Sequence, residues 1–361
     1  MHLNDKNSPI NSSISNSPIS NSPISPLRRS LLGAVPALLL GRLALAQSSS
    51  GIRLRKLHNF EIRVSDPGRS ARFYQGLFGM PVQARDGERL ILKIGDSNQF
   101  MAIRPRLVDE PTAITHIGYT VEDYDLARLQ AALEGMGFKP IAEPDSALPG
   151  LDNAMCTWVK RRGETSALFF ADERGLIVQL SDPSYCGGGG PLGANCPAPE
   201  PVAPGLLRLQ ELNHFTAFVS DGAAANTFYQ QAFDLKVQAY QGPNAPVTGI
   251  GDGHQFVMYA GAGGARAPAT LNHGSFNMYD FDVDKVRAKL SDYGLSPRPE
   301  GQQTTGPLMH YVSLRQPERG GAPGGTPELY FTDPDGILLQ LQDVTYCGGG
   351  GYLGSECLKD A

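Results

Sequence analysis

The chain has 361 residues, of which 41% are hydrophobic and 19% are charged, and its formal net charge at pH 7 is −5. This length suggests two domains of roughly 150 residues, each large enough to bury its own core. The weakly acidic balance, with no basic block after residue 72, argues against the phosphate-neutralising surface of a nucleic-acid-binding protein. No apolar run reaches the roughly 20 residues that a membrane-spanning helix needs, so we expect no permanent membrane span.

Residues 1–46 have the composition of a disordered tract followed by an export signal. Near-copies of Asn-Ser-Pro-Ile fill residues 8–26, and so polar and Pro-rich a sequence cannot bury enough apolar surface to fold. A basic Arg28-Arg29 pair, a short apolar stretch and a small-x-small triplet at 44–46 then follow in the order of a secretory signal peptide. The pair followed by Ser-Leu-Leu resembles a twin-arginine signal, although an ordinary signal with two chance arginines stays an alternative. We expect an exported bacterial protein, periplasmic or extracellular.

Four of the five cysteines form two equally spaced pairs. Nine residues, beginning with four glycines, separate Cys186 from Cys196 and Cys347 from Cys357. Two local disulfides in an oxidising compartment account for this spacing. A structural metal site is the weaker alternative, because thiolate ligands usually have about two or four residues between them. Cys156 has no matching cysteine, and we expect it to be buried as a small apolar side chain.

The two halves of the chain are copies of one another. A Val-Ser-Asp triplet followed by Phe-Tyr-Gln begins at Val64 and recurs at Val219, an offset of 155 residues. The offset is 157 between His116 and His273 and 161 at the cysteines, so the second copy has gained residues. We expect most of these in the Gly/Pro-rich stretch 315–327.

Each half also contains one order of elements twice. Alternating apolar residues over 59–64 and 116–121 predict two strands, and each strand runs into a pattern with helical spacing. The second half repeats this pattern from residues 214 and 273. Further strands follow each helix, which gives four strand-helix-strands units. One unit cannot cover its own sheet, so we expect the units to pack in pairs.

This order resembles the vicinal oxygen chelate superfamily, as do the Val-Ser-Asp…Phe-Tyr-Gln start of each half and the sequence Leu-Tyr-Phe-Thr-Asp-Pro-Asp-Gly at 329–336. The superfamily includes glyoxalase I, bleomycin-resistance proteins, methylmalonyl-CoA epimerase and the type I extradiol dioxygenases. The resemblance implies an α+β fold of two domains, each made of two βαβββ units whose mixed sheet curls around a cleft. The boundaries we expect are 1–46 for the disordered tract and cleaved signal, 52–185 for a first domain without metal, 186–205 for a disulfide loop and Pro-rich linker, 206–346 for a second domain with the metal site, and 347–361 for a disulfide-closed tail.

In this family the metal ligands occupy inward-facing strand positions, so strand alternation tests the candidates. Alternation leaves His214 and His273 for the cleft, and Gln340 takes the position where the family carries Glu. An amide oxygen supplies a dipole rather than a charge, so the site should bind a divalent ion more weakly. Gln255 is a candidate fourth ligand, by likeness to the epimerase. Fe(II) is favoured, with Mn or Zn next. As an alternative, the histidines have another role in the cleft or are only hydrogen bonded.

The first half keeps less of this set. Asn59 stands in place of the first histidine, His116 is kept, and Gln179 again replaces Glu. Glu61 shares the inward face with Asn59 and could pair with Arg63. We therefore expect a scaffold without metal, whose cleft could still bind a small ligand.

Two residues on one strand of the second half, His310 and Tyr311, are candidates for moving protons near the cleft. Alternation with Val312 argues against His310. The resemblance implies metal-dependent chemistry on a small vicinally oxygenated substrate, with an extradiol-dioxygenase-like reaction favoured. A glyoxalase- or epimerase-like lyase or isomerase and a non-catalytic small-molecule binder are the alternatives, because one fold hosts all three. The substrate and the oligomeric state, a homo-oligomer included, stay open.

We predict that the exported form of the protein begins near Gln47. The signal-like sequence ends at residues 44–46, and signal peptides are removed from the mature protein. Intact-mass measurement of the exported chain identifies its first residue. Retention of residues 1–46 in the native host would show that the targeting interpretation is wrong.

Overall fold

The structure is a computed structural model that describes residues 50–144, 155–261, 268–302 and 305–358. The expected disordered tract and signal lie outside these ranges. All described residues belong to one compact unit, residues 46–361. Within the described ranges, no helix is long and apolar enough to cross a membrane.

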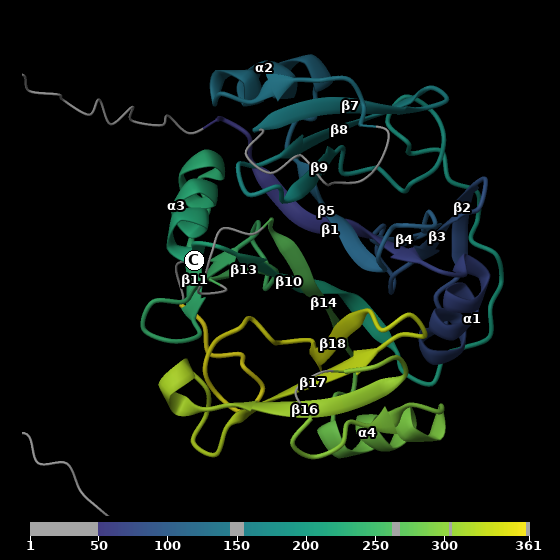
Figure 1. The fold of residues 1–361 in the computed structure, drawn as a ribbon, viewed down its shortest axis with the longest axis vertical. Helices are drawn as coiled ribbons and strands as arrows, with labels where there is room; N and C mark the ends of the chain where they lie inside the picture. Colours follow the sequence, from purple (N-terminus) through teal and green to yellow (C-terminus); the bar gives the residue numbers. More distant parts are fainter. Residues whose placement is uncertain (1–49, 145–154, 262–267, 303–304, 359–361) are drawn as a thin grey trace, which may run out of the picture. The chain divides into compact units, whose positions relative to one another are not determined.

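Each half runs through the same order of elements (Figure 1). In the first half the elements are β1 (Leu54–Val64), α1 (Pro67–Phe78), β2 (Val82–Asp86), β3 (Arg89–Lys93), β4 (Phe100–Pro105), β5 (Ala113–Val121), α2 (Leu126–Gly135), β6 (Lys139–Pro140), β7 (Cys156–Arg162), β8 (Thr165–Ala171) and β9 (Ile177–Ser181). In the second half they are β10 (Leu209–Val219), α3 (Gly222–Phe233), β11 (Val237–Tyr240), β12 (Pro246–Gly249), β13 (Phe256–Gly261), β14 (Thr270–Met278), α4 (Val283–Asp292), β15 (Ser296–Pro297), β16 (Met309–Arg315), a 3-10 turn (Pro317–Arg319), β17 (Thr326–Thr332) and β18 (Leu338–Asp343).

The strands of each half form a mixed sheet around a central antiparallel pair. In the second half this pair is β10 and β14, with β13 parallel to β10 and β18 parallel to β14. In the first half β1 and β5 form the pair, and β4 and β9 take the parallel positions. Each half is therefore built from two βαβββ units, with one extra two-residue strand in the second unit of each. The α+β fold class expected from the sequence is confirmed.

Within the described ranges, each of the four α-helices is preceded by an aspartate that caps it. The side chains of Asp66, Asp125, Asp221 and Asp282 each accept a hydrogen bond from the backbone N–H three residues further on. An aspartate at this position satisfies one of the N–H groups that a helix start leaves unpaired. The same cap in all four units agrees with their origin by duplication.

Two glutamines join the central strands of the two halves. The side chain of Gln99 donates to the carbonyl of Leu57 at 2.6 Å and accepts from the N–H of Leu212 at 3.1 Å. Gln255 does the reverse, because it donates to the carbonyl of Leu212 at 2.6 Å and accepts from the N–H of Leu57 at 2.9 Å. All four side chains are buried. These reciprocal bonds hold β1 next to β10.

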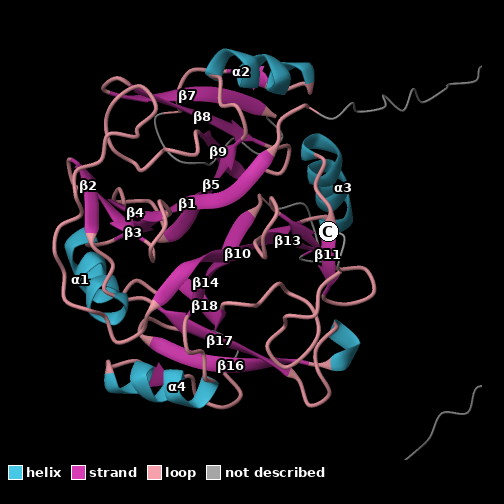
Figure 2. Cartoon of the chain, turned by 180° about the vertical axis from the view of Figure 1, so that it is seen from behind, coloured by secondary structure: helices cyan, strands magenta, loops and turns pink. Residues whose placement is uncertain are grey.

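Helices α1 and α3 each donate a tyrosine hydrogen bond to the opposite half of the chain. Figure 2 shows α1 of the first half beside α4 of the second, and α3 beside α2. The Tyr74 hydroxyl on α1 donates to Asp333 at 3.1 Å, and the Tyr229 hydroxyl on α3 donates to Asp172 at 3.2 Å. The hydrophobic core continues across the halves, since the rings of Phe60 and Phe215 lie 5.2 Å apart. Neither half buries its apolar surface alone.

Both expected disulfides are present. Cys186 is bonded to Cys196 and Cys347 to Cys357, while Cys156 is free and buried. Two disulfides fit an oxidising compartment. The expected insertion is also found, because residues 316–325 join β16 to β17 where only residues 163–164 join β7 to β8.

We predict that Gln99→Ala and Gln255→Ala each lower the free energy of unfolding by about 2 kcal/mol, because each leaves a buried backbone N–H and carbonyl without a partner. Urea denaturation measures the change. The two variants serve as controls for each other, since their contacts are equivalent. A far smaller loss in one of them would contradict the reciprocal arrangement.

Candidate metal centre

A cavity of about 180 Å³ lies on the inner face of the second-half sheet. Alternation along β10 decides which side chains reach it: Thr216 and Phe218 line the cavity with His214, while Phe215 and Ala217 are buried on the opposite face. The groups that matter for its chemistry are His214, His273, Glu328, Tyr330, Gln340 and Tyr346.

Strand register brings the three predicted ligands together. His214 on β10 lies opposite Ser275 on β14, and Ser275 pairs in turn with Gln340 on β18. His273 lies opposite Thr216, two residues along from His214. The two imidazole rings are 5.4 Å apart between centroids, at an interplanar angle of 84°. All three predicted side chains line the cavity and are buried.

An asparagine orients each imidazole. The Nδ1 atom of His214 lies 2.6 Å from Oδ1 of Asn213, and Nδ1 of His273 lies 2.8 Å from Oδ1 of Asn272. An amide oxygen only accepts hydrogen bonds, so Nδ1 carries the proton in both rings and Nε2 keeps its lone pair. A histidine that ligates a metal typically has this arrangement, with its other ring nitrogen donating to an oxygen.

Burial keeps both histidines neutral. It lowers the pKa of His273 to about 4, and burial with the nearby His273 lowers the pKa of His214 well below its usual value. Nε2 of His273 and both polar side-chain atoms of Gln340 are buried without a hydrogen bond of good geometry, although the Gln340 amide lies close enough to both imidazoles to oppose the lowering of their pKa values. Such atoms cost roughly 1–3 kcal/mol each when nothing binds them. Two neutral imidazoles and an amide oxygen form a donor set that fits a divalent ion, although the described residues contain no group of three or more His, Cys, Asp or Glu side chains that could hold one.

The carboxylate of Glu328 is held by three neighbours. Its Oε1 accepts from Nε of Arg315 at 2.9 Å and from the Tyr346 hydroxyl at 3.1 Å, and its Oε2 accepts from the Tyr330 hydroxyl at 3.2 Å. The ring of Tyr330 lies edge-on to His273 at 5.2 Å. Burial and the nearby Glu328 raise the pKa of both phenols, so they stay protonated.

Glu328, Tyr330 and Tyr346 line the cavity but were not predicted as site residues from the sequence. The signal for the first two was alternation along β17, because Tyr330 pairs directly with Gln340 and Glu328 lies two residues before it on the same face. Arg319 was also missed; it lies in the loop that only the second half has gained, and it lines the cavity from an exposed position.

The structure places three predicted site residues elsewhere. His310 points to α4, where its Nε2 lies 2.9 Å from the Ser291 hydroxyl, and it does not line the cavity. Gln255 does not line the cavity, because both ends of its amide bind backbone groups, the N–H of Leu57 and the carbonyl of Leu212. Tyr311 lies one strand further out than Tyr330 and stacks on its ring at 4.9 Å, so it supports the cavity wall without lining it.

The cleft of the first half contains ion pairs. The sequence suggested that Glu61 could pair with Arg63, but it does not. Its carboxylate contacts Nε of Arg89 at 2.6 Å and Nε of Arg104 at 3.4 Å. Arg63 pairs instead with Glu110 at 3.0 Å. These contacts supply the partners that a buried carboxylate needs.

The other polar residues of the first cleft have a local partner on one side, while Nε2 of His58 and of His116 is buried without one. Asn59 lies 3.1 Å from Nδ1 of His58, and the Gln179 amide donates to Ser181 at 3.0 Å. Nδ1 of His116 lies 3.1 Å from the Thr115 hydroxyl, and burial lowers the pKa of His116 to about 4. The first cleft therefore differs from the second in its ion pairs and in the side chain beside each histidine Nδ1.

Comparisons with known proteins agree with the resemblance drawn from the sequence. Residues 211–341 match the model of the Glyoxalase/Bleomycin resistance protein/Dioxygenase superfamily. Among solved structures, a variant of homoprotocatechuate 2,3-dioxygenase from Brevibacterium fuscum has a TM-score of 0.55 at 15% identity, over 81% of this chain and 72% of that chain. The Mn(II)-bound glyoxalase from Novosphingobium aromaticivorans has a TM-score of 0.54 at 16% identity, over 80% of this chain and 82% of that chain. No curated protein matches this sequence.

Residues 211–341, in the second half of the chain, match this superfamily's model, and the resemblance to the vicinal oxygen chelate proteins is confirmed. The described chain has the fold of the two-domain dioxygenase. At 15–16% identity this likeness establishes the fold alone, because the same fold hosts several reactions.

Proposed function

We propose that the second-half cavity binds one divalent metal through His214, His273 and Gln340. The observation that carries this proposal is the set of buried, unsatisfied side-chain atoms of His273 and Gln340 at this cavity. In addition, the Nδ1–H bonds to Asn213 and Asn272 leave the Nε2 lone pairs of both histidines for a ligand. Fe(II) is our first choice and Mn or Zn the next, since two nitrogen donors and one oxygen suit all three ions. In the first half, the ion-paired Glu61 leaves no free carboxylate for a metal.

A bound divalent ion would supply Lewis acidity, which lowers the pKa of substrate oxygens that chelate it. The chain's own residues define the rest of the site. The cavity of about 180 Å³ is smaller than the roughly 300–1,000 Å³ of pockets for drug-sized ligands, so the substrate is small. Arg319 brings a positive charge to the exposed side of the cavity, which favours an anionic substrate.

Tyr330 is the residue best placed to move a proton. Its hydroxyl is held by Glu328, and its ring contacts that of His273. Because its pKa is raised, it enters a reaction as a proton donor. Tyr311 and Arg298 lie behind it, with the Arg298 guanidinium 3.5 Å above the Tyr311 ring. We therefore give Tyr330 the role that the sequence suggested for His310 or Tyr311.

The reaction that we favour is extradiol-dioxygenase-like and oxygen-dependent, on a small vicinally oxygenated, aromatic substrate. The restriction of the metal-type residues to the second half supports it, as does the two-domain fold shared with homoprotocatechuate 2,3-dioxygenase. A glyoxalase-like lyase or isomerase is the second candidate. It is favoured by the likeness to the Mn(II)-bound glyoxalase, because the match covers 82% of that chain and only 72% of the dioxygenase chain. The third is a non-catalytic exported binder.

We predict that His214→Ala and His273→Ala lose bound metal, because each removes one nitrogen donor. His116→Ala, the matched change in the first half, should keep the metal content of the unchanged protein. Gln340→Glu should bind the ion at least about tenfold more tightly, since a carboxylate adds a charge worth more than roughly 1.4 kcal/mol. Equilibrium dialysis with elemental analysis measures all four. Equal retention in the three alanine variants would exclude this metal centre.

We predict that the Fe(II)-loaded protein consumes oxygen with a catechol-type substrate. Tyr330→Phe should lower the rate about 10²- to 10⁴-fold, the usual contribution of a positioned proton donor, whereas Tyr311→Phe should leave it nearly unchanged. An oxygen electrode gives both rates. Turnover that requires metal but no oxygen would favour the lyase or isomerase. Equal ligand binding with and without metal, and no turnover, would favour the binder.

A further inference from the structure

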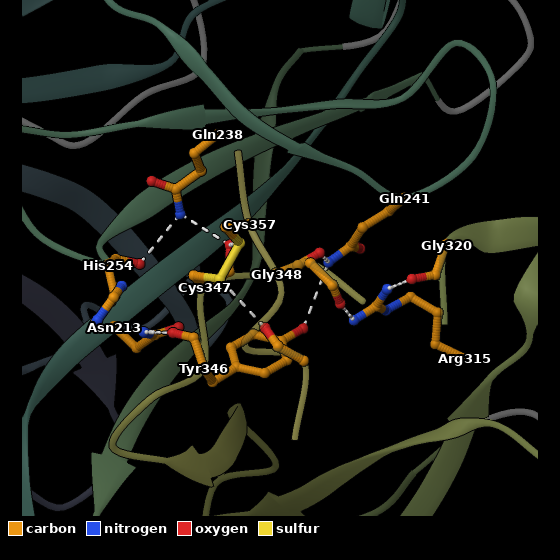
Figure 3. The surroundings of a disulfide bond; sticks show 12 residues. Asn213, Gln238, Gln241, His254, Arg315, Gly320, Tyr346, Cys347, Gly348 and Cys357 are labelled. Carbon is orange, nitrogen blue, oxygen red and sulfur yellow. Dashed lines mark hydrogen bonds between the residues drawn. A yellow bond between two sulfur atoms is a disulfide. The ribbon is translucent and has the colours of Figure 1, made fainter. Parts of the chain in front are cut away.

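We propose that the C-terminal Cys347–Cys357 loop is part of the candidate metal centre, because it holds Asn213 and thereby keeps His214 in the tautomer and orientation that bind a metal. The proposal rests on the function proposed above. Figure 3 shows the loop and the side chains that contact it. Asn213 is the positioning residue in this arrangement.

The loop is anchored to the sheet by side chains from three strands. The Gln238 amide on β11 donates to the carbonyl of Cys347 at 2.8 Å (Figure 3). Nη2 of Arg315 on β16 donates to the carbonyl of Gly349 at 2.8 Å. The Thr326 hydroxyl on β17 donates to the carbonyl of Gly351 at 2.7 Å. The disulfide closes this loop, so its carbonyls are presented to the sheet as one connected unit.

The residue that precedes the disulfide carries the contact to the metal centre. The carbonyl of Tyr346 accepts a hydrogen bond from Nδ2 of Asn213 at 2.8 Å (Figure 3). With its nitrogen held there, the Asn213 amide has only its oxygen left for Nδ1 of His214, at 2.6 Å. This bond requires the proton on Nδ1 and leaves the Nε2 lone pair for a ligand. Rotation of the Asn213 amide would present its N–H₂ group instead and favour the other tautomer.

The loop also fixes the plane of the His214 ring. That ring stacks on Phe256 with centroids 4.3 Å apart at an interplanar angle of 7°, and Tyr346 lies against it at 5.6 Å. Cys357 packs against the cluster that contains Phe256 and Tyr346. A Cβ at Gly348 would lie 3.0 Å from the Phe256 ring, so the loop backbone is in close contact with the ring that supports His214.

The first half offers a natural control for this arrangement. Its disulfide closes a loop with the same separation of 10 residues. Gln83 donates to the carbonyl of Cys186 at 2.7 Å, as Gln238 does to that of Cys347. The position of Asn213, however, is occupied by His58, which follows from the duplication offset. The first half therefore has an equivalent disulfide loop, but it lacks a histidine at the position of the candidate ligand His214.

The experiment compares Cys347→Ser/Cys357→Ser with the matched Cys186→Ser/Cys196→Ser variant. We expect similar losses in melting temperature, because the two loops are equivalent. Metal affinity, measured by titration calorimetry, should fall about 10- to 100-fold in the first variant, as for other supports of metal ligands, and stay within about twofold in the second. Equal losses of affinity in both would overturn the proposal.

A second measurement does not depend on metal. In metal-free protein, the ¹⁵N chemical shifts of the His214 ring report which nitrogen carries the proton. We expect Nδ1–H in the unchanged chain and in the Cys186→Ser/Cys196→Ser variant, but a mixture of tautomers after loss of Cys347–Cys357. If the unchanged chain binds no metal, the proposed function fails while this measurement still decides the role of the loop.

Asn213→Ala keeps both disulfides and covers the case in which the cysteine variant does not fold. It should give the same mixture of tautomers and the same loss of metal affinity. Combining Asn213→Ala with Cys347→Ser/Cys357→Ser should cause little further loss of metal affinity, because Asn213 lies between the loop and His214. Combining Asn272→Ala with the same cysteine changes should cause a further loss, because Asn272 supports His273 independently of the loop. An unchanged His214 tautomer in Asn213→Ala would overturn the proposal.

Discussion

Two β-bulges in the central strand pair of the second half determine the geometry of the candidate metal centre. The register between β10 and β14 passes from Leu212 to His214 and from Leu271 to His273, so Asn213 and Asn272 are the extra residues. In a regular strand, neighbouring side chains point to opposite faces and could not meet. A bulge redirects one of them, and each asparagine here reaches the imidazole of the next residue. The tautomer of both histidines follows from this backbone irregularity.

The first half has the same backbone device with other side chains. Its register between β1 and β5 passes over His58 and Thr115, the equivalents of the two asparagines. The order Asn-His on β10 is His-Asn at 58–59 on β1, which puts an amide where a ligand would stand. Glu61 meanwhile pairs with two arginines. The halves therefore differ through side-chain substitution on a shared framework. The same framework holds the candidate metal centre in the second half and a carboxylate paired with arginines in the first.

Period and duplication were enough to predict the four units and the inward position of His214, His273 and Gln340, because a strand with one apolar face has only one register that buries it. The α+β fold was predicted from the resemblance to the vicinal oxygen chelate superfamily. The same rule could not place Gln255, since it lies just before β13 and its amide binds the backbone of β1 in the first half. Nor could it find the bulges, which interrupt the period on which it depends. The Glu61–Arg89 pair joins strands that only the tertiary fold brings together.

Gln340, in the position where the family carries Glu, explains both the weaker metal affinity and the stronger Lewis acidity of the proposed site. A divalent ion held by two imidazoles and an amide keeps its full charge, whereas a carboxylate would cancel part of it. The Glu328–Arg315 pair beside the cavity adds no net charge, so it does not replace the missing carboxylate. The ion is then bound less tightly but polarises the oxygens of an anionic substrate more strongly. Rigid support offsets some of that loss of affinity, because donors that are already oriented lose less conformational entropy on binding. The bulged asparagines and the disulfide-closed loop provide that support on the His214 side.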